Sequence, residues 1–139
     1  MVDKTLVLRK LAELEEYLEQ IKEYANVSTE QYAKEWRTQR IVERTLQMMI
    51  ESCVDIAGHI ISDRGYRVPT SYADTFRVLY EKDILTKDLF DTMEKISKFI
   101  NIIVHHYDRI APEIVVTILK KGLNDFLIYK GVIVKLLTE

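Results

Sequence analysis

The chain has 139 residues, of which 47% are hydrophobic and 30% are charged, with only four glycines and two prolines. This composition is typical of one compact folded domain over residues 1–139 and argues against a disordered protein. The formal net charge of −2 excludes a general electrostatic attraction to nucleic acid, so any contact with RNA requires a local basic patch.

The cysteine content and the N-terminal sequence indicate the cellular compartment. Cys53 is the only cysteine, so an intrachain disulfide is excluded and nothing favours an oxidising compartment. The first twenty residues carry charges in every turn, unlike the apolar centre of a signal peptide, and no stretch approaches the roughly 18 apolar residues of a membrane span. We therefore expect a soluble, cytoplasmic protein.

Two helices are predicted in the first 65 residues. The first begins at Leu6 and ends near Asn26, because apolar residues recur at intervals of three and four with charges between them: Leu8, Leu11, Leu14, Leu18 and Ile21. The second follows a capping box, formed by Ser28 and Gln31, and runs as one long helix until Gly65.

Three more helices are predicted from start and stop signals. A short one covers about 71–82, and a long one after Thr86 reaches Tyr107. Pro112 suits the first turn of a last helix, over 113–137. No segment alternates apolar and polar residues as a half-buried strand does.

These elements predict an all-α fold, an up-and-down bundle of four long helices and one short helix. Between Leu46 and Ile61 the second helix carries apolar side chains on nearly every face, which indicates burial on several sides. We therefore expect a partner chain against this helix and a dimeric protein.

Polar residues interrupt the same apolar stretch. Glu51, Asp55 and His59 recur at intervals of four and form one stripe, with Arg40 and Arg44 on a nearby face. One interpretation is a metal site, although the later helices offer no facing carboxylate at matching spacing. The favoured interpretation is that Arg44, Glu51 and Asp55 form charge pairs at a helix or subunit interface, since buried charges persist when paired. We predict no metal and no cofactor.

The fourth helix ends on the one concentration of acid–base side chains in the chain. Lys98, Asn101 and His105 share one stripe of this helix, and the histidine is followed by His106 and Tyr107. An imidazole with a pKa near 6.5 suits proton transfer at neutral pH, and the Asn101 amide can orient it. A lone histidine on a helix is often structural, so this alternative stays open. His106 points to a different side and is interpreted as a solvent-facing neighbour.

Two segments resemble a known family. They are "RIVERTLQMMIESCVDIAGHIISDRGYRVPTSYADTFRVLYEKDILTKDLF" and "MEKISKFINIIVHHYDRIAPEIVVTILKKGLNDF", covering about residues 40–126. Both are similar to the HepT-like branch of the HEPN (higher eukaryotes and prokaryotes nucleotide-binding) superfamily. The resemblance implies a dimeric α-helical bundle with its cleft at or beside the dimer interface. It also implies a metal-independent RNA endonuclease, the toxin of a type VII toxin–antitoxin pair whose antitoxin is a minimal nucleotidyltransferase (MNT).

The motif of that family is Arg, four residues, His, one residue, Tyr. His105 and Tyr107 match its last two members, and Asn101 holds the position that commonly follows the arginine. Ile100 stands where the arginine is expected. Lys98 is a possible substitute, although lysine is a point charge where arginine offers a planar fork.

The resemblance assigns a role to each matching residue. His105 moves a proton to or from the 2′-hydroxyl or the leaving oxygen of RNA, and the product is a cyclic phosphate. Tyr107 binds the substrate and aligns with the tyrosine to which the antitoxin adds AMP. Arg109 adds positive charge if the helix extends that far. Loss of a preorganised charge typically lowers a rate by about 10²–10³, so the alternative is a protein that binds RNA, nucleotide or its nucleotidyltransferase partner without cutting.

Overall fold

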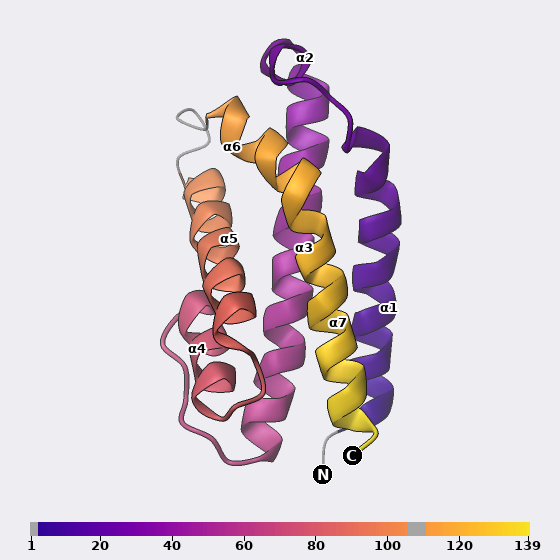
Figure 1. The fold of residues 1–139 in the computed structure, drawn as a ribbon. Helices are drawn as coiled ribbons and strands as arrows, with labels where there is room; N and C mark the ends of the chain where they lie inside the picture. The colour runs from indigo at the N-terminus through magenta and orange to yellow at the C-terminus, as the bar shows by residue number, and fades with distance from the viewer. Residues whose placement is uncertain (1–2, 106–110) are drawn as a thin grey trace.

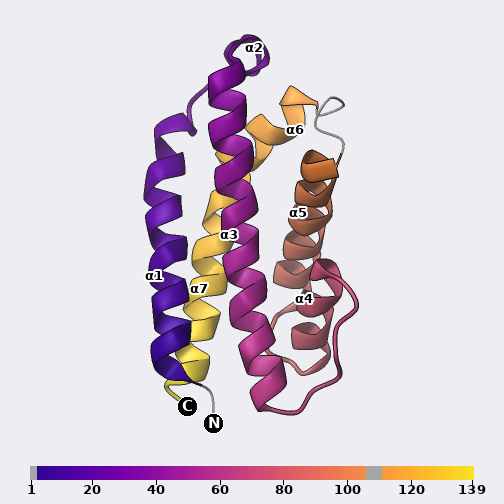
Figure 2. The same cartoon turned by 180° about the vertical axis from the view of Figure 1, so that it is seen from behind.

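The structure is a computed structural model that describes the backbone of residues 3–105 and 111–139 and the side chains of residues 3–102 and 111–139. Every regular element in these ranges is helical, as the all-α prediction required. In chain order the helices are α1 (Lys4–Ile21), η1 (Lys22–Tyr24), α2 (Thr29–Lys34), α3 (Trp36–Asp63), α4 (Tyr72–Glu81), α5 (Lys87–His105), α6 (Pro112–Thr117), η3 (Ile118–Gly122) and α7 (Leu123–Leu137). The long helix α3 lies in the middle of the bundle, with α1 and α7 on one side and α4 and α5 on the other (Figures 1 and 2). No helix in the described ranges is both long and apolar enough to span a membrane.

Helix α1 begins where the Asp3 carboxylate accepts a hydrogen bond from the Leu6 backbone N–H at 3.1 Å. Its buried face repeats at intervals of four and three residues: Val7, Leu11, Leu14, Leu18 and Ile21. The predicted face was therefore right from Leu11 onwards but wrong at Leu8, which is exposed. Val7 takes the core position because it lies one turn before Leu11.

The second predicted helix is divided in two. The Ser28 capping box is present, but α2 ends after six residues, at Glu35, which has an extended backbone with φ −110° and ψ 94°. The side-chain amide of Gln39 donates to the Tyr32 carbonyl at 2.7 Å and so satisfies a carbonyl at the end of α2. The prediction of one continuous helix was wrong because this break carries neither glycine nor proline.

The end of α3 and the starts of α4 and α5 follow the predicted signals. Gly65 has φ +66°, and the next N–H, that of Tyr66, donates to the Ile61 carbonyl at 3.0 Å, which closes the end of α3. The Ser71 hydroxyl caps α4 by accepting from the Asp74 N–H, and the Thr86 hydroxyl accepts from the Leu89 N–H at the start of α5.

The predicted last helix is an unbroken run of helical residues, but it contains a π-helical turn, η3, between α6 and α7, and α6 runs obliquely to α7 (Figure 1). A Cβ added at Gly122 in this turn would lie 3.3 Å from Ile118 Cγ2 and 3.7 Å from Ile96 Cδ1. The tight contact that a side chain would make here is therefore with Ile118 of the same turn, and the contact to α5 would be an ordinary van der Waals contact. The wider turn is a local adjustment that apolar spacing alone did not indicate.

The core is continuous across the bundle and centres on α3. The rings of Phe76 and Tyr129 meet edge to face, with centroids 5.8 Å apart. The hydroxyl of Tyr129 donates to the Cys53 carbonyl at 2.8 Å. Burial raises the pKa of the Cys53 thiol, so this cysteine is a core side chain in its protonated form. These contacts fix α4 and α7 against α3 and so hold the helices that carry the candidate site.

Candidate functional site

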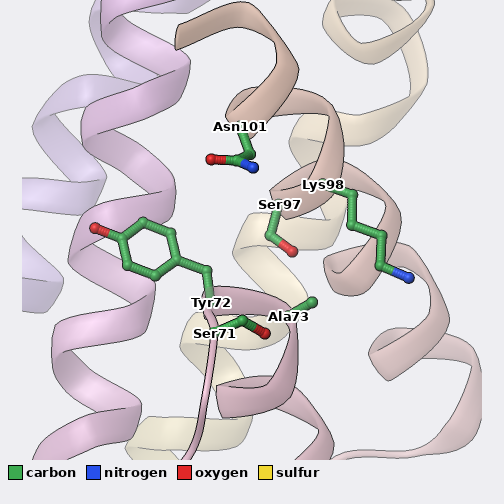
Figure 3. A pocket seen from close by; sticks show the side chains of 6 residues that line it. All are labelled: Ser71, Tyr72, Ala73, Ser97, Lys98 and Asn101. Atoms are coloured by element: carbon green, nitrogen blue, oxygen red, sulfur yellow. The ribbon is translucent and has the colours of Figure 1, made fainter. Parts of the chain in front are cut away.

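A cavity of about 390 Å³ lies between the start of α4 and the middle of α5. Among the residues that the structure describes, six line it, all drawn in Figure 3: Ser71, Tyr72, Ala73, Ser97, Lys98 and Asn101. Two of the predicted site residues, Lys98 and Asn101, therefore lie on one wall of a single cavity, as their spacing of three on a helix predicts. The other wall comes from the N-terminal turn of α4.

The α5 wall offers one cation and two neutral polar groups. Ser97 is buried, and its hydroxyl donates to the Glu94 carbonyl at 2.9 Å. The side chain of Lys98 is 64% exposed, and its ammonium nitrogen lies 3.8 Å from a carboxylate oxygen of Glu94. A pair this long and exposed is weak. The ammonium can therefore turn to a phosphate without losing a strong partner.

Ile100 faces the opposite direction. It is 3% exposed and belongs to the core of the bundle, although its helical neighbours Asn101 and Ile102 are exposed. The position at which the resemblance predicts an arginine is thus an apolar core position in this chain.

The other predicted catalytic residues are only partly described. His105 is the last residue of α5, one turn beyond Asn101, but its side chain lies outside the described set. Tyr107 and Arg109, with His106, lie outside the described residues altogether. The roles assigned to these residues stay predictions, while the course of α5 places the His105 backbone one turn past the cavity.

The α4 wall is held by a network centred on Arg67. Its guanidinium donates to both carboxylate oxygens of Asp74 at 2.8 Å, and to the two oxygens of Glu81 at 2.9 and 3.1 Å. The Thr70 N–H donates to the same Asp74 carboxylate at 2.9 Å, while the Asp74 N–H donates to the Ser71 hydroxyl at 3.0 Å. Bidentate arginine–carboxylate pairs fix geometry as well as charge. The first turn of α4 is therefore pinned to the preceding loop.

This network predicts a specific loss of stability in acid. Hydrogen bonds from Arg67, followed by the one from the Thr70 N–H, hold the pKa of Asp74 well below its usual range. A carboxyl with a depressed folded-state pKa stabilises the fold at pH values above its unfolded pKa, and that contribution is lost as the pH falls below about 4. We expect the thermal midpoint to fall by a few degrees more between pH 5 and pH 2 in the natural protein than in Asp74→Asn. Thermal melts followed by circular dichroism measure the midpoint of each protein. If the midpoint falls equally with pH in both proteins, this role of Asp74 is contradicted.

The polar stripe of α3 forms a row beside the cavity. An Arg44 N–H donates to the Gln47 amide oxygen at 3.0 Å, and the Gln47 amide donates to Glu51 at 3.2 Å. Asp55 lies 3.5 Å from the ammonium of Lys10 on α1. The partners seen for the two carboxylates are thus an amide and a lysine, whereas arginine was predicted. Their place at a subunit interface stays a prediction.

The metal interpretation finds no support in the described part of the chain. His59 is exposed at the far end of the stripe from Glu51. Across the described residues, no three or more His, Cys, Asp or Glu side chains are grouped so that they could hold a metal ion.

Tyr72 was missed by the sequence analysis. Its spacing of four from Phe76 suggests a core position, yet 48% of Tyr72 is exposed on the cavity. Partial burial, and then the carboxylates of Glu51 and Asp55, raise its pKa, so the hydroxyl stays protonated at neutral pH. Its position depends on the packing of α4 against α5, which periodicity within α4 does not describe.

The fold and the site can now be compared with known proteins. The chain is 30% identical over 122 residues to the mRNA nuclease HepT of Shewanella oneidensis, and these residues cover 87% of this chain and 90% of that protein. It is 27% identical over 128 residues to the tRNA nuclease HepT of Aphanizomenon flos-aquae, covering 92% of this chain and 87% of that protein.

Solved structures agree with these relatives. A toxin–antitoxin structure with AMP-PNP matches with a TM-score of 0.89 and 28% identity, covering 95% of this chain and 99% of the other. The tri-AMPylated HEPN toxin of Shewanella oneidensis, in complex with its MNT antitoxin, matches with a TM-score of 0.87 and 29% identity over 97% of this chain and 99% of the other. The family model described as "Ribonuclease HepT-like" matches residues 14–133, a longer span than the predicted resemblance over residues 40–126. The chain therefore belongs to the HepT-like ribonuclease family of the HEPN superfamily.

Proposed function

We propose that this protein is a metal-independent RNA endonuclease, the toxin of a type VII HEPN/MNT toxin–antitoxin pair that acts in the cytoplasm. The observation that carries the proposal is the cavity beside α5, where Lys98 and Asn101 line one wall, two helical turns and one helical turn before His105. A cation, an amide and an imidazole on one helical stripe are the groups needed to bind a phosphodiester and move a proton. Relatives with the same fold are named as mRNA and tRNA nucleases, which supports RNA as the substrate.

The proposed reaction is an attack of the RNA 2′-hydroxyl on the adjacent phosphorus. The oxygen–phosphorus bond that forms closes a 2′,3′-cyclic phosphate, and the bond from phosphorus to the 5′-oxygen breaks. His105 either accepts the proton from the 2′-hydroxyl or donates one to the leaving 5′-oxygen. Lys98 stabilises the negative charge on the phosphate in place of the arginine that Ile100 replaces, and Asn101 orients the imidazole.

The partner is proposed to be a minimal nucleotidyltransferase. The HEPN toxin of Shewanella oneidensis carries AMP groups in a complex with an MNT antitoxin, and its fold matches over 97% of this chain. In the corresponding step here, the Tyr107 hydroxyl attacks the α-phosphorus of ATP, AMP is transferred to the tyrosine and pyrophosphate leaves. An AMP group two residues after His105 would block access of RNA to the imidazole.

The active form is proposed to be a homodimer. Ile102 follows Asn101 on α5 and is 46% exposed, so this helix presents an apolar side chain to solvent next to a residue that lines the cavity. A second copy of the chain would remove that surface from water. Arg44, Glu51 and Asp55 are the charged residues of α3 that we assign to this subunit interface, where RNA would enter between the two copies.

A second function is favoured by the burial of Ile100. Because this side chain lies in the core, no cation occupies the motif position, and Lys98, an exposed point charge, is a poor substitute for a planar guanidinium. In this alternative the chain holds RNA or nucleotide, or docks its nucleotidyltransferase partner, without cutting.

Growth assays separate the two functions. We expect expression of the natural chain alone to stop bacterial growth, and co-expression with the nucleotidyltransferase encoded beside it to restore growth. The purified co-expressed protein should gain the mass of AMP, and Tyr107→Phe should not. Normal growth with folded natural chain present at high level would favour the non-cutting alternative, and toxicity that His105→Ala retains would contradict the nuclease site.

A further inference from the structure

The exposed ring of Tyr72 is placed to contact a ligand in the cavity. Tyr72 contributes one wall, and the ring projects from the start of α4 into the space between α3 and α5 (Figure 3). Nearly half of its surface is accessible, although most large side chains of α4 are in the core. An accessible aromatic face beside a polar wall is a platform on which a nucleobase can stack.

The backbone that carries the ring is held in place before any ligand binds. Tyr72 is the first residue of α4, directly after the Ser71 cap and two residues before Asp74. The guanidinium of Arg67 fixes Asp74 with two hydrogen bonds of 2.8 Å. A platform on a pinned helical turn loses little conformational freedom on binding, which favours affinity.

Charge decides which part of a nucleotide fits against this ring. Glu51 and Asp55 on α3 are near enough to influence the ionisation of Tyr72, so this side of the cavity repels a phosphate. Lys98 stands on the α5 wall together with the neutral Asn101. A neutral base can therefore lie against Tyr72 while its phosphate turns to Lys98.

The distance along α5 relates this base to the reacting phosphate. Asn101 and His105 are four residues apart, and a rise of 1.5 Å per residue puts them about 6 Å apart along the helix axis. This distance is comparable to the separation of neighbouring nucleotides in an extended strand. A base stacked on Tyr72 would thus belong to a nucleotide next to the phosphate that His105 serves.

We infer that Tyr72 stacks an unpaired base of single-stranded RNA beside the cleaved phosphate, so that the protein selects RNA whose bases are free of a helix. The inference rests on the proposed function for the identity of the ligand. It adds a substrate-binding residue from α4 to a site otherwise formed by α5. A base inside a double helix has both faces covered and could not use this platform.

Binding of a fluorescent RNA tests the inference without cleavage. The probe is a single-stranded RNA that carries 2-aminopurine, whose fluorescence falls on stacking, and the protein carries His105→Ala so that the RNA stays intact. We expect Tyr72→Ala to weaken binding by about 5- to 150-fold and to remove the quenching, since a stacked base contributes about 1–3 kcal/mol. Tyr72→Phe keeps the ring and should bind like the parent protein.

A matched variant controls for loss of any exposed aromatic side chain. Trp36 is 64% exposed at the start of α3, outside the lining of the cavity, and Trp36→Ala should leave binding unchanged. The inference is overturned if Tyr72→Ala binds as well as Trp36→Ala, or if light scattering shows that Tyr72→Ala only separates a dimer into monomers. Tyr72-dependent quenching, together with no RNA cleavage by the natural chain that keeps His105, would support the stacking and overturn the nuclease proposal. RNA cleavage at an unchanged rate in Tyr72→Ala would support the nuclease proposal and overturn the stacking.

Discussion

Replacing His105 with alanine is expected to lower the rate of RNA cleavage by about 10²–10⁴-fold, because general acid–base catalysis by a positioned side chain contributes a factor of this size. The fold should not change, since His105 is the final residue of α5 and the helix packs through earlier positions such as Met93 and Ile96. The measurement is the initial rate of cleavage of a single-stranded RNA by the purified protein.

His106→Ala is the control for this experiment. The two histidines are adjacent in the sequence, so a helical continuation would turn the second about 100° away from the Lys98 and Asn101 stripe. We expect His106→Ala to retain most of the natural rate. Equal losses in both variants, or no loss in His105→Ala, would show that the imidazole of His105 does not carry the chemistry.

Replacing Ile100 with arginine is expected to destabilise the protein by about 3–5 kcal/mol, the usual effect of an uncompensated charge in a core. Ile100 is 3% exposed, so an arginine at this position would leave its guanidinium without water or a partner. An arginine placed at position 100, where the family motif has one, should therefore not act as a catalytic arginine. Urea denaturation gives the change in the free energy of unfolding.

Ile102→Arg is the matched substitution two residues along the same helix. Ile102 is 46% exposed in the single chain, so at protein concentrations where both proteins are monomeric its arginine variant should stay within about 1 kcal/mol of the natural protein. If Ile100→Arg is as stable as Ile102→Arg and also cleaves RNA faster than the natural chain, position 100 faces the site. The account of this protein as one that lacks the motif cation would then be wrong.

The helix ends could be predicted from the sequence because each depends on a local hydrogen bond. Ser28, Ser71 and Thr86 all accept backbone N–H groups as N-terminal caps, and Gly65 takes the left-handed backbone that ends α3. These interactions span three to five residues. They are therefore visible in the chain without any knowledge of tertiary packing.

The breaks in regular helix could not be predicted in the same way. Glu35 ends α2 with no glycine or proline nearby, and the side chain of Gln39 compensates a carbonyl seven residues before it. The π-helical turn at Ile118–Gly122 lies beside Ile96 on a different helix. Both features depend on contacts that a helical repeat does not encode.

The candidate site also combines residues that local sequence predicts with a residue that only tertiary packing places. Lys98 and Asn101 share a cavity because their spacing on α5 alone determines a common face. Tyr72 joins them only because α4 packs on α5, with Tyr80 stacked on Phe90 and Arg77 paired with Glu94 at 2.9 Å. The spacing of residues within one helix predicts which residues of that helix share a face. The residues of the opposite wall can be identified only when the packing of the two helices is known.

The central claim is that this chain cuts RNA through the 2′-hydroxyl, with His105 and without a metal or the motif arginine. Incubating the purified natural protein with single-stranded RNA in the presence of EDTA, and identifying the product ends by mass spectrometry, tests it most directly. The account predicts 2′,3′-cyclic phosphate ends and no cut at a linkage whose 2′-hydroxyl is replaced by hydrogen. Intact RNA, or cleavage that persists at the 2′-deoxy linkage, would contradict it.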